Sequence, residues 1–379
     1  MTSKLTEFFS DEEIGRVMNG PGSLHRLPGS AFRSQAYHEF EQANWLDRTW
    51  LFVGRCSDIP NAGDVKPIPG YPMFLVRGTD SQVRVFHNAC RHRGHRLVAE
   101  KGERRARLVC PYHKWTYGLD GHLLRAPHFI GPGKHESDAF SPEEHSLLQV
   151  RCGVWRDWIF INIDGGAEPL ADFVAPLEAK LAFVDFGALK HFLTMTAREL
   201  PANWKLCLEN TMEPYHVPFI HAETAAGQPL AGHYMIVDDP VTGSAIDILG
   251  SEYTNRPGGS DLTTLNMSAR FLCRLPNLFL TSYAPDVIVD TMILPDSRDP
   301  RKSWMEQAWY TTSGREMSDE EIERWRALEH TVIDEDIAVM RGSQEGVESS
   351  AVNDGGVLSP AWETCISGLY RHLVSRLSE

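Results

Sequence analysis

The chain is 379 residues long, 42% of its residues are hydrophobic, and its formal net charge is −14 at pH 7. This length and hydrophobic content allow two or three domains with a sizeable core, and the acidic balance argues against nucleic acid or an anionic membrane as a partner. Seven scattered cysteines and an N-terminus without a long apolar run predict a cytoplasmic protein with no disulfide framework, signal peptide or transmembrane helix.

The first half of the chain changes character near residue 40. Residues 1–40 are expected to form a helical arm. In residues 41–165, short apolar runs such as residues 71–76 and 158–163 alternate with turns rich in Gly, Pro and Asp. Short apolar runs separated by such turns are typical of an all-β domain.

The second half, residues 166–379, mixes strands with helices. Helices are expected at 203–212, 318–342 and 361–377, among segments that favour strands. This pattern predicts an α+β domain with helices on an antiparallel sheet. Because the N-terminal arm is expected to pack on this domain, the all-β domain is interpreted as an insertion.

Two mixed pairs of metal-binding residues lie in the all-β segment. Cys90 and His92 form one pair, and Cys110 and His113 form the other, each after a predicted strand. Two thiolates and two imidazoles suit a [2Fe–2S] cluster in which one iron takes the sulfurs and the other the nitrogens. Such a cluster passes single electrons and does no substrate chemistry, so a second metal site is expected further along the chain.

A single zinc ion is the alternative for these four residues, because two Cys and two His can bind zinc tetrahedrally. Zinc sites usually repeat C-x2–4-C and H-x3–5-H spacings, and the C-x-H pair at Cys90 departs from them. The cluster is therefore the favoured interpretation.

The segments from Cys90 to His95 and from Cys110 to Trp115 resemble the Rieske-type [2Fe–2S] domain. The resemblance implies that the two cysteines bind one iron. It implies that His92 and His113 bind the other.

A second group of polar residues follows the predicted helix at 203–212. Glu209, Glu213 and His216 are spaced to share one helix face. His216 and His221 are five residues apart, which on one continuous helix would separate them by about 140°. Pro218 lies between them and allows the chain to fold His221 back.

Two imidazoles and one carboxylate make the facial triad of non-heme Fe(II) oxygenases. The carboxylate candidates are Asp334, Glu335 and Asp336, on a helix expected to begin near Ser318. A buried carboxylate without a partner is costly, and a metal would remove that cost. Spacing alone does not choose among the three. Two ordinary core histidines are the alternative for His216 and His221.

The segment from Asn203 to His221 resembles the mononuclear-iron motif in the catalytic α subunits of Rieske non-heme iron oxygenases. The resemblance spans about residues 40 to 375. It implies a helix-grip type catalytic domain in which His216, His221 and Asp336 hold Fe(II). It also implies a head-to-tail homotrimer.

In that trimer Glu213 would bridge to a Rieske histidine of the neighbouring subunit. Asn203 and Tyr215 are candidates for supporting the metal ligands, with plain helix packing as the alternative for both. The sequence leaves open whether the trimer also contains a small partner subunit.

The resemblance implies a terminal oxygenase that uses O2 and electrons from NAD(P)H, through a separate reductase or a ferredoxin, to hydroxylate a small aromatic or related substrate. Glu213 stands where ring-hydroxylating dioxygenases commonly have Asp, and this resembles the branch that oxidises quaternary ammonium compounds. Monooxygenation or demethylation of an N-methyl compound is therefore the alternative. A Rieske electron carrier is a third, non-enzymatic alternative.

The expected substrate pocket is apolar and comes from strands after residue 270. Its predicted members are Phe271, Leu272, Phe279, Leu280, Tyr283, Met292 and Leu294. Such a set favours a flat apolar substrate. An ammonium substrate would need an aromatic cage, for which Tyr283, Trp304, Trp309 and Tyr310 are candidates.

Overall fold

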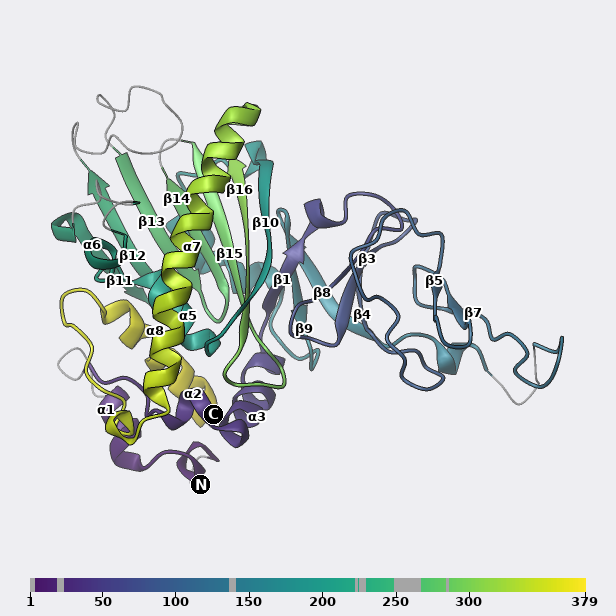
Figure 1. Ribbon diagram of the computed structural model, residues 1–379, viewed down its shortest axis with the longest axis horizontal. Coiled ribbons are helices and arrows are strands. Elements are labelled where there is room, and N and C mark those ends of the chain that lie inside the picture. The colour runs from purple at the N-terminus through teal and green to yellow at the C-terminus, as the bar shows by residue number, and fades with distance from the viewer. Residues whose placement is uncertain are drawn as a thin grey trace. The chain divides into compact units, whose positions relative to one another are not determined.

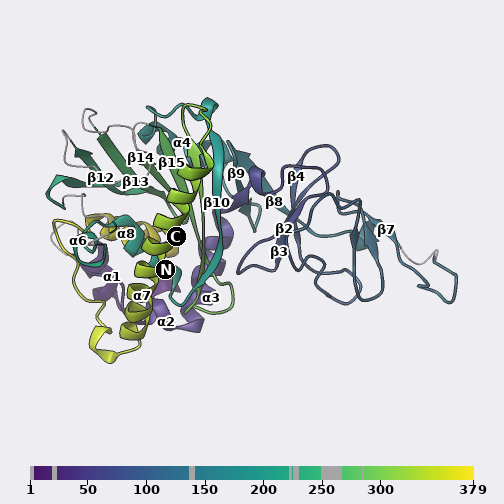
Figure 2. The same ribbon diagram turned by 45° about the horizontal axis from the view of Figure 1, so that its top comes forward.

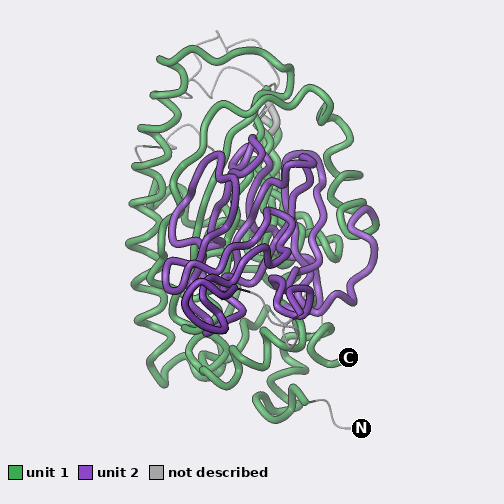
Figure 3. Tube along the Cα trace, turned by 90° about the vertical axis from the view of Figure 1, so that its right-hand side faces the viewer, with its two compact units in different colours: residues 1–46, 172–379 green, residues 47–171 purple. Residues whose placement is uncertain are grey.

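The computed structural model describes residues 4–18, 24–135, 141–221, 224, 230–248, 267–283 and 286–379. The chain divides into two compact units, coloured separately in Figure 3. One unit is Asp47–Ala171, and the other joins Met1–Leu46 to Asp172–Glu379. The N-terminal arm belongs to the larger unit and extends to Leu46, beyond the expected end at residue 40. Near its end, the ring of Trp45 lies 5.8 Å from that of Trp204.

The smaller unit is built from antiparallel strands. Six strands form one sheet in the order β1-β9-β8-β4-β3-β2, and β5, β6 and β7 form a second sheet. The strands are β1 (Leu51–Arg55), β2 (Val65–Pro67), β3 (Met73–Arg77), β4 (Val83–His87), β5 (Leu108–Val109), β6 (Thr116–Tyr117), β7 (Leu123–Arg125), β8 (Gln149–Trp155) and β9 (Trp158–Asn162). Phe74, Phe86, Trp115 and Tyr117 are part of one buried cluster, which fixes the turns that carry the cysteine and histidine pairs.

The larger unit contains a seven-stranded antiparallel sheet in the order β10-β16-β15-β14-β13-β12-β11. Its strands are β10 (Lys190–Leu200), β11 (His233–Asp238), β12 (Val241–Ile248), β13 (Met267–Arg274), β14 (Leu278–Tyr283), β15 (Val287–Pro295) and β16 (Ser303–Thr311). Every residue of the interior strand β15 is buried, so both faces of the sheet are covered there. The expected α+β fold with helices on an antiparallel sheet is confirmed.

Helices complete the larger unit. They are α1 (Asp11–Met18), α2 (Ser30–Arg33), α3 (Gln35–Asn44), α4 (Leu170–Lys180), α5 (Trp204–Met212), α6 (Val217–Ile220), α7 (Asp319–Val347) and α8 (Thr364–Ser378). The long helix α7 runs across the sheet (Figures 1 and 2). It begins at a capping box in which the Ser318 hydroxyl accepts from the Glu321 N–H, as the sequence predicts. No helix in the described ranges is long and apolar enough to cross a membrane.

A buried ion pair joins the N-terminal arm to α5. Lys205 Nζ lies 2.8 Å from Glu41 Oε2, and both side chains are fully buried. Burial lowers the pKa of Lys205, although the Glu41 carboxylate opposes that shift. Trp204 Nε1 also donates to Glu41. The arm therefore fixes the start of the helix that leads to the expected iron ligands.

Candidate metal centres

The cysteine and histidine pairs lie on two tight turns of the smaller unit. Gly94 N donates to Cys90 O at 2.8 Å, and Lys114 N donates to Cys110 O at 3.0 Å. Gly94 has a φ of +72°, which a residue with a side chain rarely adopts. Both thiols are buried, while the rings of His92 and His113 are half-buried with centroids 4.7 Å apart.

The donor atoms fit a two-iron cluster better than a single ion. His113 Nδ1 is buried and has no hydrogen-bond partner, which is costly unless a ligand satisfies it. A tetrahedral zinc ion would need donor atoms about 3.3–3.8 Å apart. In the part of the chain that the structure describes, three such donor atoms lie within 4.8 Å of one another at one place only, and it is not here. The zinc alternative therefore does not fit.

One sulfur has a hydroxyl beside it. Tyr117 Oη lies 3.2 Å from Cys90 Sγ and accepts a hydrogen bond from Arg91 N at 3.0 Å. A thiolate sulfur can only accept, so in the cluster-bound state the Tyr117 hydroxyl donates to it. His92 stacks on Trp115, with ring centroids 4.9 Å apart and planes at 10°. These contacts hold both turns in place.

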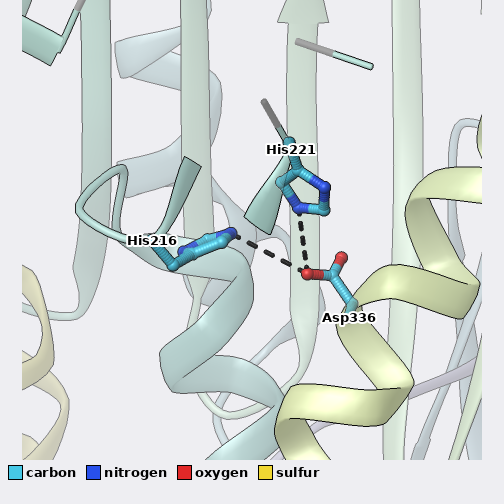
Figure 4. Close-up of side chains that lie close together, drawn as sticks. All are labelled: His216, His221 and Asp336. Atoms are coloured by element: carbon cyan, nitrogen blue, oxygen red, sulfur yellow. Dashed lines mark hydrogen bonds and ion pairs between the residues drawn. The ribbon is translucent and has the colours of Figure 1, made fainter. Parts of the chain in front are cut away.

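The second group of donors lies in the larger unit, where three elements meet. His216 follows α5, His221 follows α6, and Asp336 lies on α7 (Figure 4). Asp336 Oδ1 is 3.1 Å from His221 Nε2 and 3.8 Å from His216 Nε2. One donor atom from each of the three residues lies within 4.8 Å of the others. Two imidazoles and one carboxylate in this arrangement match the facial triad of non-heme iron.

A carboxylate stands behind each histidine. His216 Nδ1 lies 2.5 Å from Glu213 Oε1, and His221 Nδ1 lies 2.7 Å from Glu335 Oε2. If each Nδ1–H donates to its carboxylate, the Nε2 lone pairs are left to face Asp336, as metal-binding histidines require. Burial alone would lower the pKa of His221, but the Asp336 and Glu335 carboxylates raise it to about 8. The site therefore favours a cation.

The structure separates the three consecutive acidic residues of α7. Asp334 Oδ1 pairs with Arg198 at 2.8 Å, and its side chain is 64% exposed. Glu335 accepts from His221 and from the Thr224 hydroxyl at 2.8 Å. Asp336 faces both histidines. A helix turns by about 100° per residue, so three neighbours point in three directions.

Asn203 lies at the opposite end of α5 from the histidines. Its side-chain oxygen accepts from Lys205 N at 3.0 Å, and its Nδ2 donates to Pro300 O at 2.7 Å. These contacts make Asn203 a helix cap, not the support for the metal ligands that the sequence suggests. The residue of α5 that contacts the triad is Asn210, whose Nδ2 donates to Asp336 Oδ1 at 2.8 Å.

Sequence reasoning missed Asn210, although a signal for it was present. Asn210 comes three residues before Glu213 and so shares its helix face. Glu209, which was expected on that face, instead accepts from Arg26 Nε at 2.8 Å and pairs with Tyr370. Tyr215 is 43% exposed. Its backbone N–H donates to Glu213, and its ring lies 6.2 Å from that of Phe219.

A cavity of about 180 Å³ adjoins the triad. Glu213, His216, His221 and Asp336 line it on the side of the helices. Its other lining residues include Ser244, Phe271, Phe279, Thr281, Tyr283, Thr291, Gln307, Trp325, Glu329 and His233. The cavity lies within one unit and places the triad in contact with space for a small molecule.

Four of the seven predicted pocket residues do not line the cavity. Phe271, Phe279 and Tyr283 line the cavity, as predicted. The four aliphatic members are not among its lining residues: Leu272, Leu280, Met292 and Leu294. Successive side chains of a strand point to opposite faces of the sheet. The prediction of these four is therefore wrong.

The predicted aromatic cage is also incomplete. Of its four candidates only Tyr283 lines the cavity. Trp304 Nε1 donates to Asp296, and the Tyr310 hydroxyl donates to Asp290. Trp309 packs in the neighbouring buried cluster with Trp325.

Two family models match the chain. The model of the ring-hydroxylating α subunit (catalytic domain) matches residues 186–379, which is half of the chain. The model of the Rieske [2Fe–2S] domain matches residues 49–131. The chain belongs to the ring-hydroxylating α-subunit family of Rieske oxygenases. It therefore carries the two iron cofactors of that family, a Rieske [2Fe–2S] cluster and a mononuclear iron.

Several curated relatives of this α subunit are oxygenase subunits of monooxygenases. The glycine betaine monooxygenase oxygenase subunit of Pseudomonas aeruginosa is 38% identical over 200 residues, which are 52% of this chain and 45% of the relative. The carnitine monooxygenase oxygenase subunit of Escherichia coli is 34% identical over 200 residues, 52% of each chain. The alignments thus span about half the length of these relatives. Choline monooxygenase of Spinacia oleracea is 25% identical over 347 residues, 90% of this chain and 76% of the relative.

Solved structures share the fold. A quaternary ammonium Rieske monooxygenase superposes with a TM-score of 0.81 at 21% identity, covering 96% of this chain and 98% of the other. Naphthalene 1,2-dioxygenase with bound indole gives a TM-score of 0.75 at 18% identity, covering 94% and 92%. The same α-subunit fold therefore occurs in proteins named for ammonium compounds and in proteins named for aromatic hydrocarbons.

Proposed function

We propose that this α subunit is a terminal oxygenase that oxidises a small molecule with O2 in the cavity beside the triad. A separate reductase, directly or through a ferredoxin, would bring electrons from NAD(P)H. The observation that carries the proposal is the cavity of about 180 Å³ with His216, His221 and Asp336 in its wall. When bound, the cluster supplies electrons one at a time and the ferrous ion supplies O2 activation.

The chain's own residues have separable tasks in this proposal. Cys90 and Cys110 would hold one iron of the cluster, and His92 and His113 the other. His216, His221 and Asp336 would hold the mononuclear iron. Glu213 and Glu335 keep the Nδ1 protons of the two histidines and so leave each Nε2 free to bind metal.

We propose a head-to-tail homotrimer in which the cluster of one chain serves the triad of the next. Near the cluster, Tyr112 is 52% exposed, and beside Glu213 and His216 the side chain of Phe219 is 72% exposed. Contiguous exposed apolar side chains mark an interaction site, and the ring of Phe219 packs against that of Tyr215, which is 43% exposed. Glu213 would then bridge to a histidine of the neighbouring cluster. A Phe219→Asp protein should sediment as a monomer and lose turnover while its cluster keeps its visible spectrum.

We propose an ammonium compound as the substrate class. Glu213, Glu329 and Asp336 give the cavity three carboxylates. The ring of Tyr283 lies 5.9 Å from Phe271 and 6.1 Å from Trp325. A cation is attracted both by carboxylates and by aromatic faces. The proteins named as relatives that act on glycine betaine, carnitine and choline support this choice.

Hydroxylation of a neutral aromatic compound is the second candidate. Phe271, Phe279, Tyr283 and Trp325 give the cavity a largely aromatic surface that fits a flat ring. The electron-carrier alternative is less well supported, because an electron carrier needs only the cluster and gives His216, His221 and Asp336 no function. A cytoplasmic location is also part of the proposal, because none of the seven cysteines forms a disulfide.

Iron and sulfide analysis followed by turnover tests the function. An oxygenase should hold roughly three irons and two sulfides per chain. With a surrogate reductase it should couple NADH and O2 consumption to product formation from choline-type ammonium compounds or from neutral aromatic compounds. The sample should be the full chain. Two irons per chain, with no substrate-dependent O2 uptake, would leave an electron carrier and sink the proposal.

A further inference from the structure

We propose that the cavity selects against carboxylate groups and accepts a neutral hydrogen-bonding group, such as a hydroxyl, on its sheet side. The inference rests on the proposed function and narrows its substrate class. Glycine betaine and carnitine, for which two of the relatives are named, both carry a carboxylate. The inference therefore separates this α subunit from those relatives by the chemistry of the cavity.

The first observation is the charge of the cavity wall. Glu329 precedes Asp336 by seven residues on α7, which places the two carboxylates about 10 Å apart along the helix. Glu213 contributes a third carboxylate. Among the described residues that line the cavity none is Lys or Arg. A substrate carboxylate held away from the triad would thus be desolvated near Glu329 and without a basic side chain among the described residues, which is costly. At the triad itself, the charge of the bound iron offsets that of Asp336.

The two histidines of the triad are not available to bind a substrate carboxylate. His216 and His221 are committed to the triad, where Glu213 and Glu335 hold their second nitrogens. The remaining histidine in the wall is His233, on the edge strand β11, with its ring 6.4 Å from Phe271. If the cavity does bind carboxylates, His233 is the side chain expected to bind the carboxylate.

The second observation is a set of neutral polar groups on the sheet side. Ser244 on β12 and Thr281 on β14 both lie opposite Phe271 of β13, so the two hydroxyls stand two strands apart, about 10 Å. Both residues are buried, and neither side chain has a hydrogen-bond partner among the described residues. Both residues line the cavity, so a molecule bound there is placed to satisfy them.

A third neutral group adjoins these hydroxyls. Gln307 on β16 faces Thr291 on β15, and its Nε2 lies 3.2 Å from the Thr291 hydroxyl oxygen. The Gln307 Oε1 is buried without a partner. Because the triad lies on the helices and these groups lie on the sheet, a substrate oxidised at one end would present its other end to Ser244, Thr281 or Gln307. A hydroxyl both donates and accepts, so it satisfies such groups without adding charge.

Matched probe pairs test the inference by calorimetric binding to the anaerobic holoprotein. Choline and glycine betaine share a trimethylammonium head and differ in a hydroxyl or a carboxylate. Benzyl alcohol and benzoate make the same comparison without the ammonium group. In each pair that binds, we expect the alcohol to bind at least about tenfold tighter than the carboxylate, a difference of about 1.4 kcal/mol.

Using two probe pairs allows the selection against carboxylates and the proposed ammonium substrate class to be tested separately. If only the aromatic pair binds with the alcohol preferred, the ammonium class fails and the selection against carboxylates stands. If a carboxylate probe binds as tightly as its alcohol, the inference is overturned. Loss of that carboxylate binding in a His233→Gln protein would show that His233 holds the carboxylate. Failure of all four probes to bind overturns it as well, because each is small enough for the cavity.

A gain-of-function variant adds a second test. Gln307→Lys places a positive charge on the sheet side of the cavity, and Gln307→Met is the neutral control. The carboxylate-to-alcohol ratio of affinities should be at least about tenfold higher in the Lys variant than in the Met variant, because both lack the amide and only Lys adds a charge. An unchanged ratio in a Lys variant that still binds the alcohols contradicts the inference. If the Lys variant fails to fold, the parent protein's probe pairs decide.

Discussion

The hydroxyl of Tyr117 offers the sharpest test of the cluster site. It accepts from Arg91 N and lies 3.2 Å from Cys90 Sγ, so its own proton is available to the sulfur. Tyr117→Phe removes this donor and keeps the ring in the buried cluster where Tyr117 packs. Since the reduced cluster carries one more negative charge than the oxidised one, loss of a donor should destabilise the reduced state and lower the potential.

The size of the shift follows from the strength of one hydrogen bond. A net contribution of about 0.5–1.5 kcal/mol is typical. For a one-electron couple, about 59 mV corresponds to a tenfold change in the equilibrium constant, which is 1.4 kcal/mol. If the whole bond energy separates the two oxidation states, the potential should fall by about 20–60 mV.

A redox titration followed by electron paramagnetic resonance of the reduced cluster measures this shift without turnover. Tyr112→Phe is the matched control, because Tyr112 is also next to a cluster ligand but is 52% exposed and its ring packs on His113 at 3.8 Å, away from Cys90. Its potential should equal that of the parent. Equal potentials for the Tyr117→Phe and Tyr112→Phe proteins would refute the argument that the phenol donates to the sulfur.

Three further predictions concern the larger unit. Asp336→Asn should lose the mononuclear iron and keep the cluster, whereas Asp334→Asn should keep both by iron and sulfide analysis; equal losses would contradict the assignment of the third ligand. Glu335→Gln should weaken metal binding about 10- to 100-fold in a chelator competition, and an unaltered affinity would deny Glu335 its positioning role. Glu41→Leu should destabilise the unit by about 3–5 kcal/mol in urea because Lys205 is left buried and unpaired. Adding Lys205→Met should restore most of that loss, and a further loss would contradict the explanation.

The local parts of both sites were predictable from sequence. Each cysteine and histidine pair lies within one turn, so the spacing of Cys90 and His92 reports their proximity directly. The break between His216 and His221 was also predicted, because α6 has a proline at its first turn. In each case neighbouring residues fix the geometry, and no distant contact is needed.

The third ligand depends on how distant elements pack. Asp334, Glu335 and Asp336 are adjacent and chemically similar, so no local rule ranks them. Their directions on α7 were known to differ, but the direction that faces the histidines is set by how α7 packs on the sheet and on α5. Resemblance to the family selected Asp336, and the contacts in the structure give each of the other two a different partner.

The cavity shows which sequence signal was overlooked. The predicted pocket includes consecutive apolar residues such as Phe271 and Leu272, although strand alternation allows only one of them to face the cavity. Polar residues such as Thr281 and Thr291 were passed over, because polar positions in an antiparallel sheet usually face water. Here both faces of the sheet are covered at its interior, where every residue of β15 is buried. On such a sheet a polar side chain has no solvent to reach, so its presence at an inward position marks the cavity and the chemistry of what enters it.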